Sequence, residues 1–128
     1  CIKKEQIRLL GPSDYFVTSA EFTCYPFVLW LSDYEGSYNK DEVKETFTIP
    51  LKTLLQITPD FYEVKSKIIP PDDFPFDKIV GGRNYKWRER KTTQYFYEVD
   101  GRTIWGLTAR MLKGFLDILR EENLDRRK

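Results

Sequence analysis

The C-terminal third of the sequence carries the pattern that most constrains the fold. Asp100-Gly101 is a typical two-residue hairpin turn, and apolar runs at 95–99 and 103–105 flank it. Apolar side chains then recur at helical spacing and predict one buried stripe. The residues of this stripe are Leu107, Met111, Leu112, Phe115, Ile118 and Leu119. The sequence therefore predicts a hairpin that leads directly into a C-terminal helix.

Two segments upstream of this hairpin also have strand character. Residues 22–31 are almost continuously apolar and aromatic, which favours a buried strand with Trp30 in the core and a bulge or edge near its proline. Residues 42–49 alternate between polar and apolar types, as a half-buried strand does. Pro50 suits the first turn of a short helix that follows.

The composition is that of a folded protein with one core. Of the 128 residues, 41% are hydrophobic, and we expect residues 1–128 to form a single domain of mixed α/β or α+β class. No apolar run approaches the roughly 20 residues of a membrane-spanning helix, and no basic leader with an apolar stretch is present. Two cysteines without zinc-ligand spacing suit a reducing cytoplasm, so we expect a cytoplasmic protein with no membrane partner.

The absence of histidine excludes several classes of catalytic site. Ser-His and Cys-His pairs lack their usual general base. Zinc sites built from thiolate and imidazole lack their ligands. Hydrolytic chemistry in such a chain would therefore depend on carboxylates and metal ions.

Charge is spread unevenly, although the net charge is only +1. Residues 1–82 carry 9 Lys and Arg against 13 Asp and Glu, whereas residues 83–128 carry 12 against 7. A basic region of this size attracts phosphate groups. It is much less basic than a typical nucleic-acid-binding module, so we expect no nucleic-acid partner.

Two motifs occur in a fixed order along the chain. Residues 39–55 read NKDEVKETFTIPLKTLL, and residues 102–112 read RTIWGLTARML. The first resembles the pattern N-x-x-E-V-x-E-x-F-x-x-P-L-x-x-L-L of Nudix hydrolases of the coenzyme A pyrophosphatase group. The second is similar to the I-W-G-x-T-A-x-x-L that opens the last helix of that group. An ordered pair of motifs is much harder to obtain by chance than either motif alone.

This resemblance implies a fold, an activity and a metal. The fold would be a Nudix-like mixed β-sheet between helices. The activity would be hydrolysis of coenzyme A, or of a related nucleoside diphosphate derivative, to two phosphorylated halves. It would use Mg²⁺ or Mn²⁺ held by clustered glutamates on one helix, the Nudix box.

The sequence contains no such glutamate cluster, so we expect no metal ligands within it. The adjacent pair Glu121-Glu122 is expected to be a solvated helix end. On the resemblance, the chain is the C-terminal part of a hydrolase whose catalytic helix precedes Cys1, and it is inactive alone.

The candidate site residues fall in two segments. Glu42 matches the family's glutamate at the mouth of a strand, where the resemblance implies a supporting catalytic role; the alternative is the polar face of that strand. Residues 70–91 are predicted to form a long basic loop. Its substrate-binding candidates are Arg83, Lys86, Trp87, Arg88 and Arg90, with adenine stacked on Trp87 or Tyr85 and phosphates paired with the cations. The alternative is a solvated basic loop. Trp105 is expected to fill the core.

Three other functions stay open from the sequence. One is a Nudix hydrolase of another substrate, such as a nucleotide sugar. Another is a non-catalytic Nudix-like ligand-binding domain. The third, a nucleic-acid-binding module, depends only on the basic residues 83–91. A homodimer is a possible assembly, because many Nudix folds pair.

Overall fold

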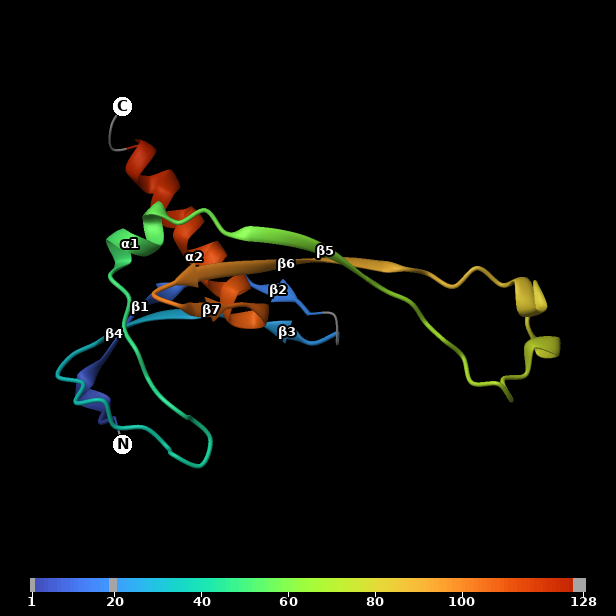
Figure 1. The fold of residues 1–128 in the computed structure, drawn as a ribbon, viewed down its shortest axis with the longest axis horizontal. Helices are drawn as coiled ribbons and strands as arrows, with labels where there is room; N and C mark the ends of the chain where they lie inside the picture. The colour runs from blue at the N-terminus through green and yellow to red at the C-terminus, as the bar shows by residue number, and fades with distance from the viewer. Residues whose placement is uncertain (1, 19–20, 126–128) are drawn as a thin grey trace.

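Small antiparallel sheets and two α-helices make up the part of the chain that the structure, a computed structural model, describes: residues 2–18 and 21–125. Strand β1 (Ile7–Pro12) pairs with β4 (Phe27–Leu31), and β2 (Phe16–Val17) pairs with β3 (Thr23–Cys24). The third sheet has the order β5-β6-β7, from β5 (Asp60–Ser66), β6 (Arg90–Val99) and β7 (Arg102–Ile104). The helices are α1 (Leu51–Gln56) and α2 (Gly106–Asp125), and Figure 1 shows their arrangement. The predicted α+β class is confirmed; the described strands form separate small sheets where one mixed sheet was expected.

The predicted hairpin and C-terminal helix are confirmed. Asp100 and Gly101 have φ values of 49° and 70°, and two positive φ values in succession are what a type I′ hairpin turn requires. The turn sets β6 against β7 with Tyr97 opposite Ile104, and α2 begins two residues after that strand ends. Helix α2 then packs against β6, the first strand of this hairpin.

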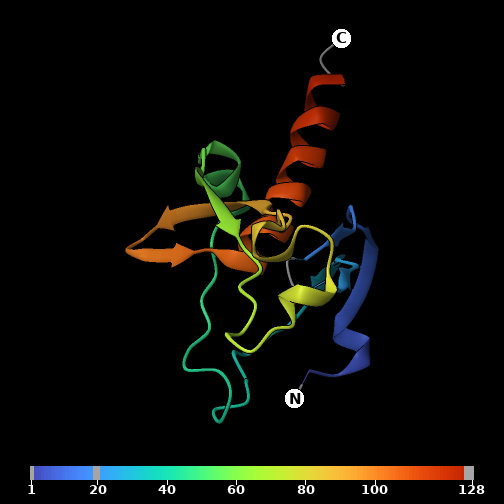
Figure 2. The ribbon, with the colours of Figure 1, turned by 90° about the vertical axis from the view of Figure 1, so that its right-hand side faces the viewer.

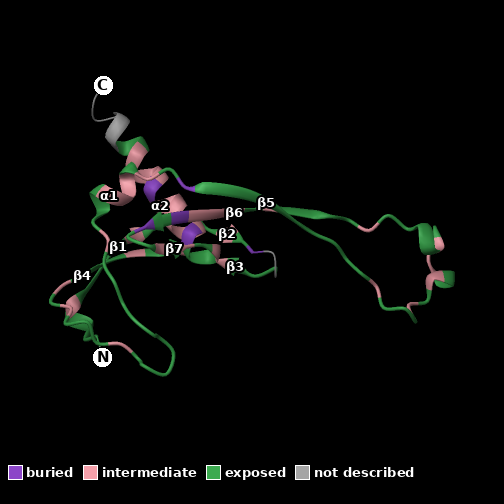
Figure 3. Ribbon diagram, viewed as in Figure 1, coloured by how far each residue is buried: buried purple, intermediate pink, exposed green. Residues whose placement is uncertain are grey.

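The core lies between β6 and α2 (Figure 3). Tyr97, Ala109 and Leu116 are fully buried there, and burial raises the pKa of the Tyr97 phenol. Ala109, Leu112 and Leu116 share one helix face because they are spaced by three and four residues. The predicted stripe is right for Leu112 and Phe115, which pack against the core, and wrong for Leu107, which is exposed.

The N-terminal apolar segment differs from its prediction. Residues 22–31 form two strands, β3 and β4, and the chain leaves the sheet at Tyr25-Pro26, where proline has no amide hydrogen for a ladder. The expectation that Trp30 is in the core is wrong, because 58% of it is exposed. Strand β4 has only β1 as a strand partner among the described residues, and Figure 2 shows this two-stranded sheet beside the start of α2. Val28 and Leu29 of β4 line a hollow of about 350 Å³ together with Met111 of α2, so the helix faces the sheet without filling the space between them.

The strand predicted for residues 42–49 is wrong. The segment starts with a tight turn, in which the amides of Glu42 and Val43 donate to the carbonyl of Asn39, and it then runs as an irregular loop. Arg102 holds the loop to β7: its guanidinium lies 4.9 Å from the centre of the Phe47 ring and 3.6 Å from the Glu45 carboxylate. The local alternation of residue types was genuine, but no neighbouring strand among the described residues offers a ladder. The short helix predicted after Pro50 is confirmed as α1.

A long hairpin arm projects from the body of the molecule (Figure 1). Strands β5 and β6 pair from Asp60 opposite Phe96 to Ser66 opposite Arg90. The predicted long connection is present, although β6 already begins at Arg90. We call residues 67–87 the arm tip; they contain two short 3-10 helices, Phe76–Lys78 and Gly82–Asn84.

Within residues 2–18 and 21–125, no helix combines the length and the apolar character that crossing a bilayer requires. Helix α2 is the longer of the two and carries charged side chains along its length.

Candidate functional site

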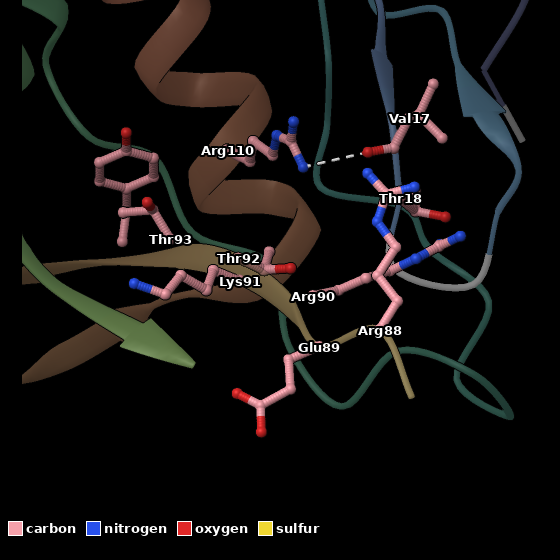
Figure 4. Close-up of a pocket in the computed structure, with 10 residues that line it drawn as sticks. Val17, Thr18, Arg88, Glu89, Arg90, Lys91, Thr92, Thr93 and Arg110 are labelled. Carbon is pink, nitrogen blue, oxygen red and sulfur yellow. Dashed lines mark hydrogen bonds between the residues drawn. The ribbon is translucent and has the colours of Figure 1, made fainter. Parts of the chain in front are cut away.

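A basic cavity of about 570 Å³ lies where three elements meet. Its walls come from Val17 and Thr18 at the end of β2, from residues 88–93 and Tyr95 at the start of β6, and from Arg110 on α2. Figure 4 shows Arg110 reaching toward Val17, with the Arg88 and Arg90 side chains directed to the same region beside Thr18. Three guanidinium groups from two distant parts of the sequence thus converge on one space.

Arg110 is held in place by two contacts. Its guanidinium carbon lies 4.3 Å from the centre of the Phe16 ring, and Nη1 donates a hydrogen bond of 3.3 Å to the carbonyl oxygen of Val17. A guanidinium has five N–H donors, so most of its donors stay available to a ligand. Sequence reasoning did not single out Arg110 as a binding candidate. The signal that could have found it is a cation early in a helix, where the helix dipole favours anions.

Alternation along the start of β6 separates the charged side chains. Arg88 and Arg90 point toward the β2 side, whereas Glu89 and Lys91 point away from it (Figure 4). Arg90 forms an ion pair with Glu21, which lies in the connection between β2 and β3. Arg88 and Arg90 were both predicted as binding residues, and the structure brings both to this cavity.

The one acidic residue that lines this cavity is already paired elsewhere. Lys67 donates a hydrogen bond to Glu89, with 2.9 Å between Nζ and Oε1, and this contact lowers the pKa of the Glu89 carboxyl below its ordinary value. Four cations line the cavity beside this one acid, and two of them have acidic partners, Glu21 for Arg90 and Glu63 for Lys91. The other two are Arg88 and Arg110. The field in the cavity favours an anionic ligand.

A smaller recess of about 200 Å³ adjoins the basic cavity. The two share Thr18, Thr92, Thr93 and Arg110, and the recess adds Gln94 of β6 and Gly106 at the start of α2. Hydroxyl and amide groups therefore continue the row of donors along β6. Such donors can bind and orient a phosphorylated ligand, but neither cavity has the histidine or cysteine of a nucleophilic site.

The other predicted binding residues lie at the arm tip, outside the cavity wall. Trp87 packs edge-to-face against Phe74 and Tyr85, with ring centres 5.6 Å and 5.0 Å apart. Arg83 lies 4.9 Å above the Phe76 ring. Lys86 is exposed between these aromatic residues. The predicted basic loop is thus divided between two places. Its last cations, Arg88 and Arg90, line the cavity, whereas residues 83–87 belong to the aromatic cluster at the arm tip.

Glu42 lies in the irregular loop that precedes α1, and it is not among the residues that line the basic cavity. Its backbone amide donates to the carbonyl oxygen of Asn39, and its side chain is exposed. The structure therefore does not bring Glu42 together with the predicted phosphate-binding residues.

In the part of the chain that the structure describes, no three side chains of His, Cys, Asp or Glu lie close enough to hold a metal ion. The described residues do not fit a Mg²⁺ or Mn²⁺ site of the carboxylate kind.

Comparisons of the chain with protein-family models, with curated proteins and with solved structures found no match.

Proposed function

We propose that the chain is the substrate-binding, C-terminal portion of a metal-dependent Nudix diphosphate hydrolase that cleaves coenzyme A or a related nucleoside diphosphate derivative. The observation that carries this proposal is the convergence of Arg88, Arg90 and Arg110 on one cavity. The two motifs at residues 39–55 and 102–112 supply the reaction class.

The cavity suits a diphosphate for a chemical reason. Guanidinium groups bind phosphate oxygens with paired, charge-assisted hydrogen bonds, and a diphosphate offers oxygens to several of them at once. Lys91 also lines the cavity, but its ammonium pairs with Glu63 at 3.0 Å, so the arginines are the main ligand-binding cations. In this role the chain binds and orients the substrate and balances its charge.

Hydrolysis itself needs groups that the described residues do not supply. On this proposal, Mg²⁺ or Mn²⁺ binds to glutamates of a Nudix box outside the described residues, and that segment completes a larger sheet between helices. The large accessible surface of the chain supports a further segment that packs against it. The accessible surface is 11100 Å², whereas a compact monomer of 15.3 kDa exposes about 7,100 Å².

A second candidate is a Nudix-like binding domain without catalytic activity. It is favoured by the lack of a three-residue metal cluster among residues 2–18 and 21–125. The same cavity would then bind a phosphorylated ligand without cleaving it. A nucleotide sugar in place of coenzyme A is compatible with either form.

Calorimetric titration with inorganic pyrophosphate tests the binding step. Arg110→Gln should weaken binding about 10- to 100-fold, because it removes charged hydrogen bonds to the ligand. Arg8→Gln is the matched control, since Arg8 also lies over an aromatic ring, 6.0 Å from the centre of Trp30, but on β1. Equal losses in the two variants, or none in either, would contradict the proposal.

Cleavage is tested separately by ³¹P NMR of coenzyme A incubated with the protein and Mg²⁺ or Mn²⁺. Two phosphorylated products that appear only with the metal ion support the hydrolase. Tight binding of coenzyme A with no metal-dependent product supports the non-catalytic domain.

A further inference from the structure

Three aromatic side chains form a row on the sheet β5-β6-β7. The rings of Phe96 and Trp105 are parallel, with an interplanar angle of 4° and centres 6.0 Å apart. Tyr62 of β5 meets Phe96 edge-to-face, with ring centres 5.6 Å apart. Trp105 was expected in the core, and this is wrong, because 61% of it is exposed, as is 61% of Tyr62. We call Tyr62, Phe96 and Trp105 the aromatic row.

The aromatic row lies on the face of the sheet opposite the core. Side chains alternate along a strand, so Phe96 points away from the side on which its neighbour Tyr97 is buried against α2. The strand register sets Tyr62 opposite Gln94 and Asp60 opposite Phe96, which places Tyr62 and Phe96 diagonally on one face. Tyr62 and Trp105 are exposed and Phe96 is half-buried between them, so the rings offer stacking surface to a planar ligand.

The face of β6 that carries Phe96 continues along the strand to the recess beside the basic cavity. Gln94 is the next residue after Phe96 on the same face of β6, about 7 Å away, and it lines the recess that shares Arg110 with the basic cavity. On the other side, Trp105 is bonded to Gly106, which lines the same recess. A path of polar groups therefore connects the stacking surface to the guanidinium groups.

We propose that the aromatic row binds the planar heterocycle of a nucleotide while the phosphates of that nucleotide lie among Arg110, Arg90 and Arg88. The proposal rests on the proposed function, which places the phosphates, and it moves the base from Trp87 or Tyr85 to Trp105. A small nucleotide fits better than a nucleic-acid strand. The cations gather in one cavity instead of following a groove, and the net charge of the chain is only +1.

The test compares ADP with inorganic pyrophosphate by calorimetry. Trp105→Leu should weaken ADP binding about 5- to 150-fold and leave pyrophosphate binding unchanged, because only ADP has a base to stack. Trp30→Leu is the control: it removes a tryptophan of nearly equal exposure, 58%, from β4, and both affinities should stay at their original values. Trp105→Leu with unchanged ADP affinity, or with equal losses for both ligands, would overturn the proposal.

Adenosine separates this proposal from the one on which it rests. Quenching of tryptophan fluorescence by adenosine should be present in the original protein and in Trp30→Leu, and lost in Trp105→Leu. If pyrophosphate binding is absent or indifferent to Arg110→Gln while this quenching persists, the proposed function fails and the stacking surface stands. If pyrophosphate binding depends on Arg110 and adenosine does not quench through Trp105, the stacking surface alone is refuted.

Discussion

The two ends of strand β6 are organised in opposite ways. At the C-terminal end, in the body of the molecule, Tyr97 is fully buried against α2, and this helix carries Arg110 to the cavity beside the first residues of β6. At the other end, the rings of the arm tip pack against one another: Phe74, Phe76, Tyr85 and Trp87. The body end is a tertiary structure that distant segments build together, whereas the tip is a local cluster. The difference indicates that cations form a candidate binding site only where separate elements bring them together. A run of cations in the sequence does not suffice.

Truncation of apolar side chains at both ends should break this comparison if it is wrong. Leu116→Ala empties a fully buried position and should lower the free energy of unfolding by about 2–5 kcal/mol. Ile69→Ala removes a side chain that is 86% exposed at the tip and should cost less than about 0.5 kcal/mol. Urea denaturation of both variants gives the two values. Similar costs would show that the arm tip belongs to the same cooperative unit.

Two glycines in turns, one at each end of β6, give a second test of this comparison. Gly101 has a φ of 70°, and a Cβ added there would meet no atom within 4 Å, so Gly101→Ala introduces backbone strain alone, about 1–2 kcal/mol. Gly81 has a φ of 90° at the tip, and Gly81→Ala should cost less, because the tip can open locally and release the strain. The same denaturation experiment measures both. A larger cost for Gly81→Ala would contradict the local character of the tip.

Tyr97 carries a buried hydroxyl for which the described residues offer no hydrogen-bond partner. Tyr97→Phe should therefore raise the free energy of unfolding by about 1 kcal/mol.

The raised pKa of the Tyr97 phenol also has a consequence at high pH. A group whose pKa is higher in the folded state contributes stability below its unfolded pKa of about 10 and loses that contribution as the pH rises through the folded value. Tyr97→Phe should be less sensitive to pH above about 10, as thermal denaturation at pH 9 and pH 11 would show.

The smallest effect concerns the ion pair where the arm tip joins β6. Lys67→Met should bring the pKa of Glu89 back up toward its ordinary value, because the hydrogen bond from Lys67 is the main cause of the lowering. In the original protein, the stabilisation from this pair is present above the ordinary pKa of a glutamate and is lost as the pH falls through the lowered value. Lys65→Met is the control, since Lys65 acts on Glu89 only through its charge and should shift the pKa less. A ¹³C NMR titration of the carboxyl measures both shifts.

Local patterns in the sequence predicted the elements that depend on local chemistry. Asp100-Gly101 determines its own turn, and the apolar spacing after Gly106 determines its own helix. Packing was predicted less well, because burial of Trp30 or Trp105 depends on whether another element covers its face, and no local pattern records this. Residues 42–49 show the same limit, since an alternating segment becomes a strand only where a neighbour offers a ladder.

The candidate site was half predictable for the same reason. Arg88 and Arg90 were found because they lie in a dense basic run, whereas Arg110 is a single cation on a helix that tertiary packing brings to Val17. Arg83, Lys86 and Trp87 belong to the same basic run, but the arm carries them to its tip.

Amide NMR during a pyrophosphate titration tests the central claim most directly, because it locates the bound anion on the chain. The account predicts that the largest shifts fall at Val17, Thr18, residues 88–93 and Arg110, and that residues 74–87 of the arm tip stay unchanged. Shifts confined to the arm tip, or the absence of saturable shifts, would contradict the assignment of this cavity as the phosphate-binding site.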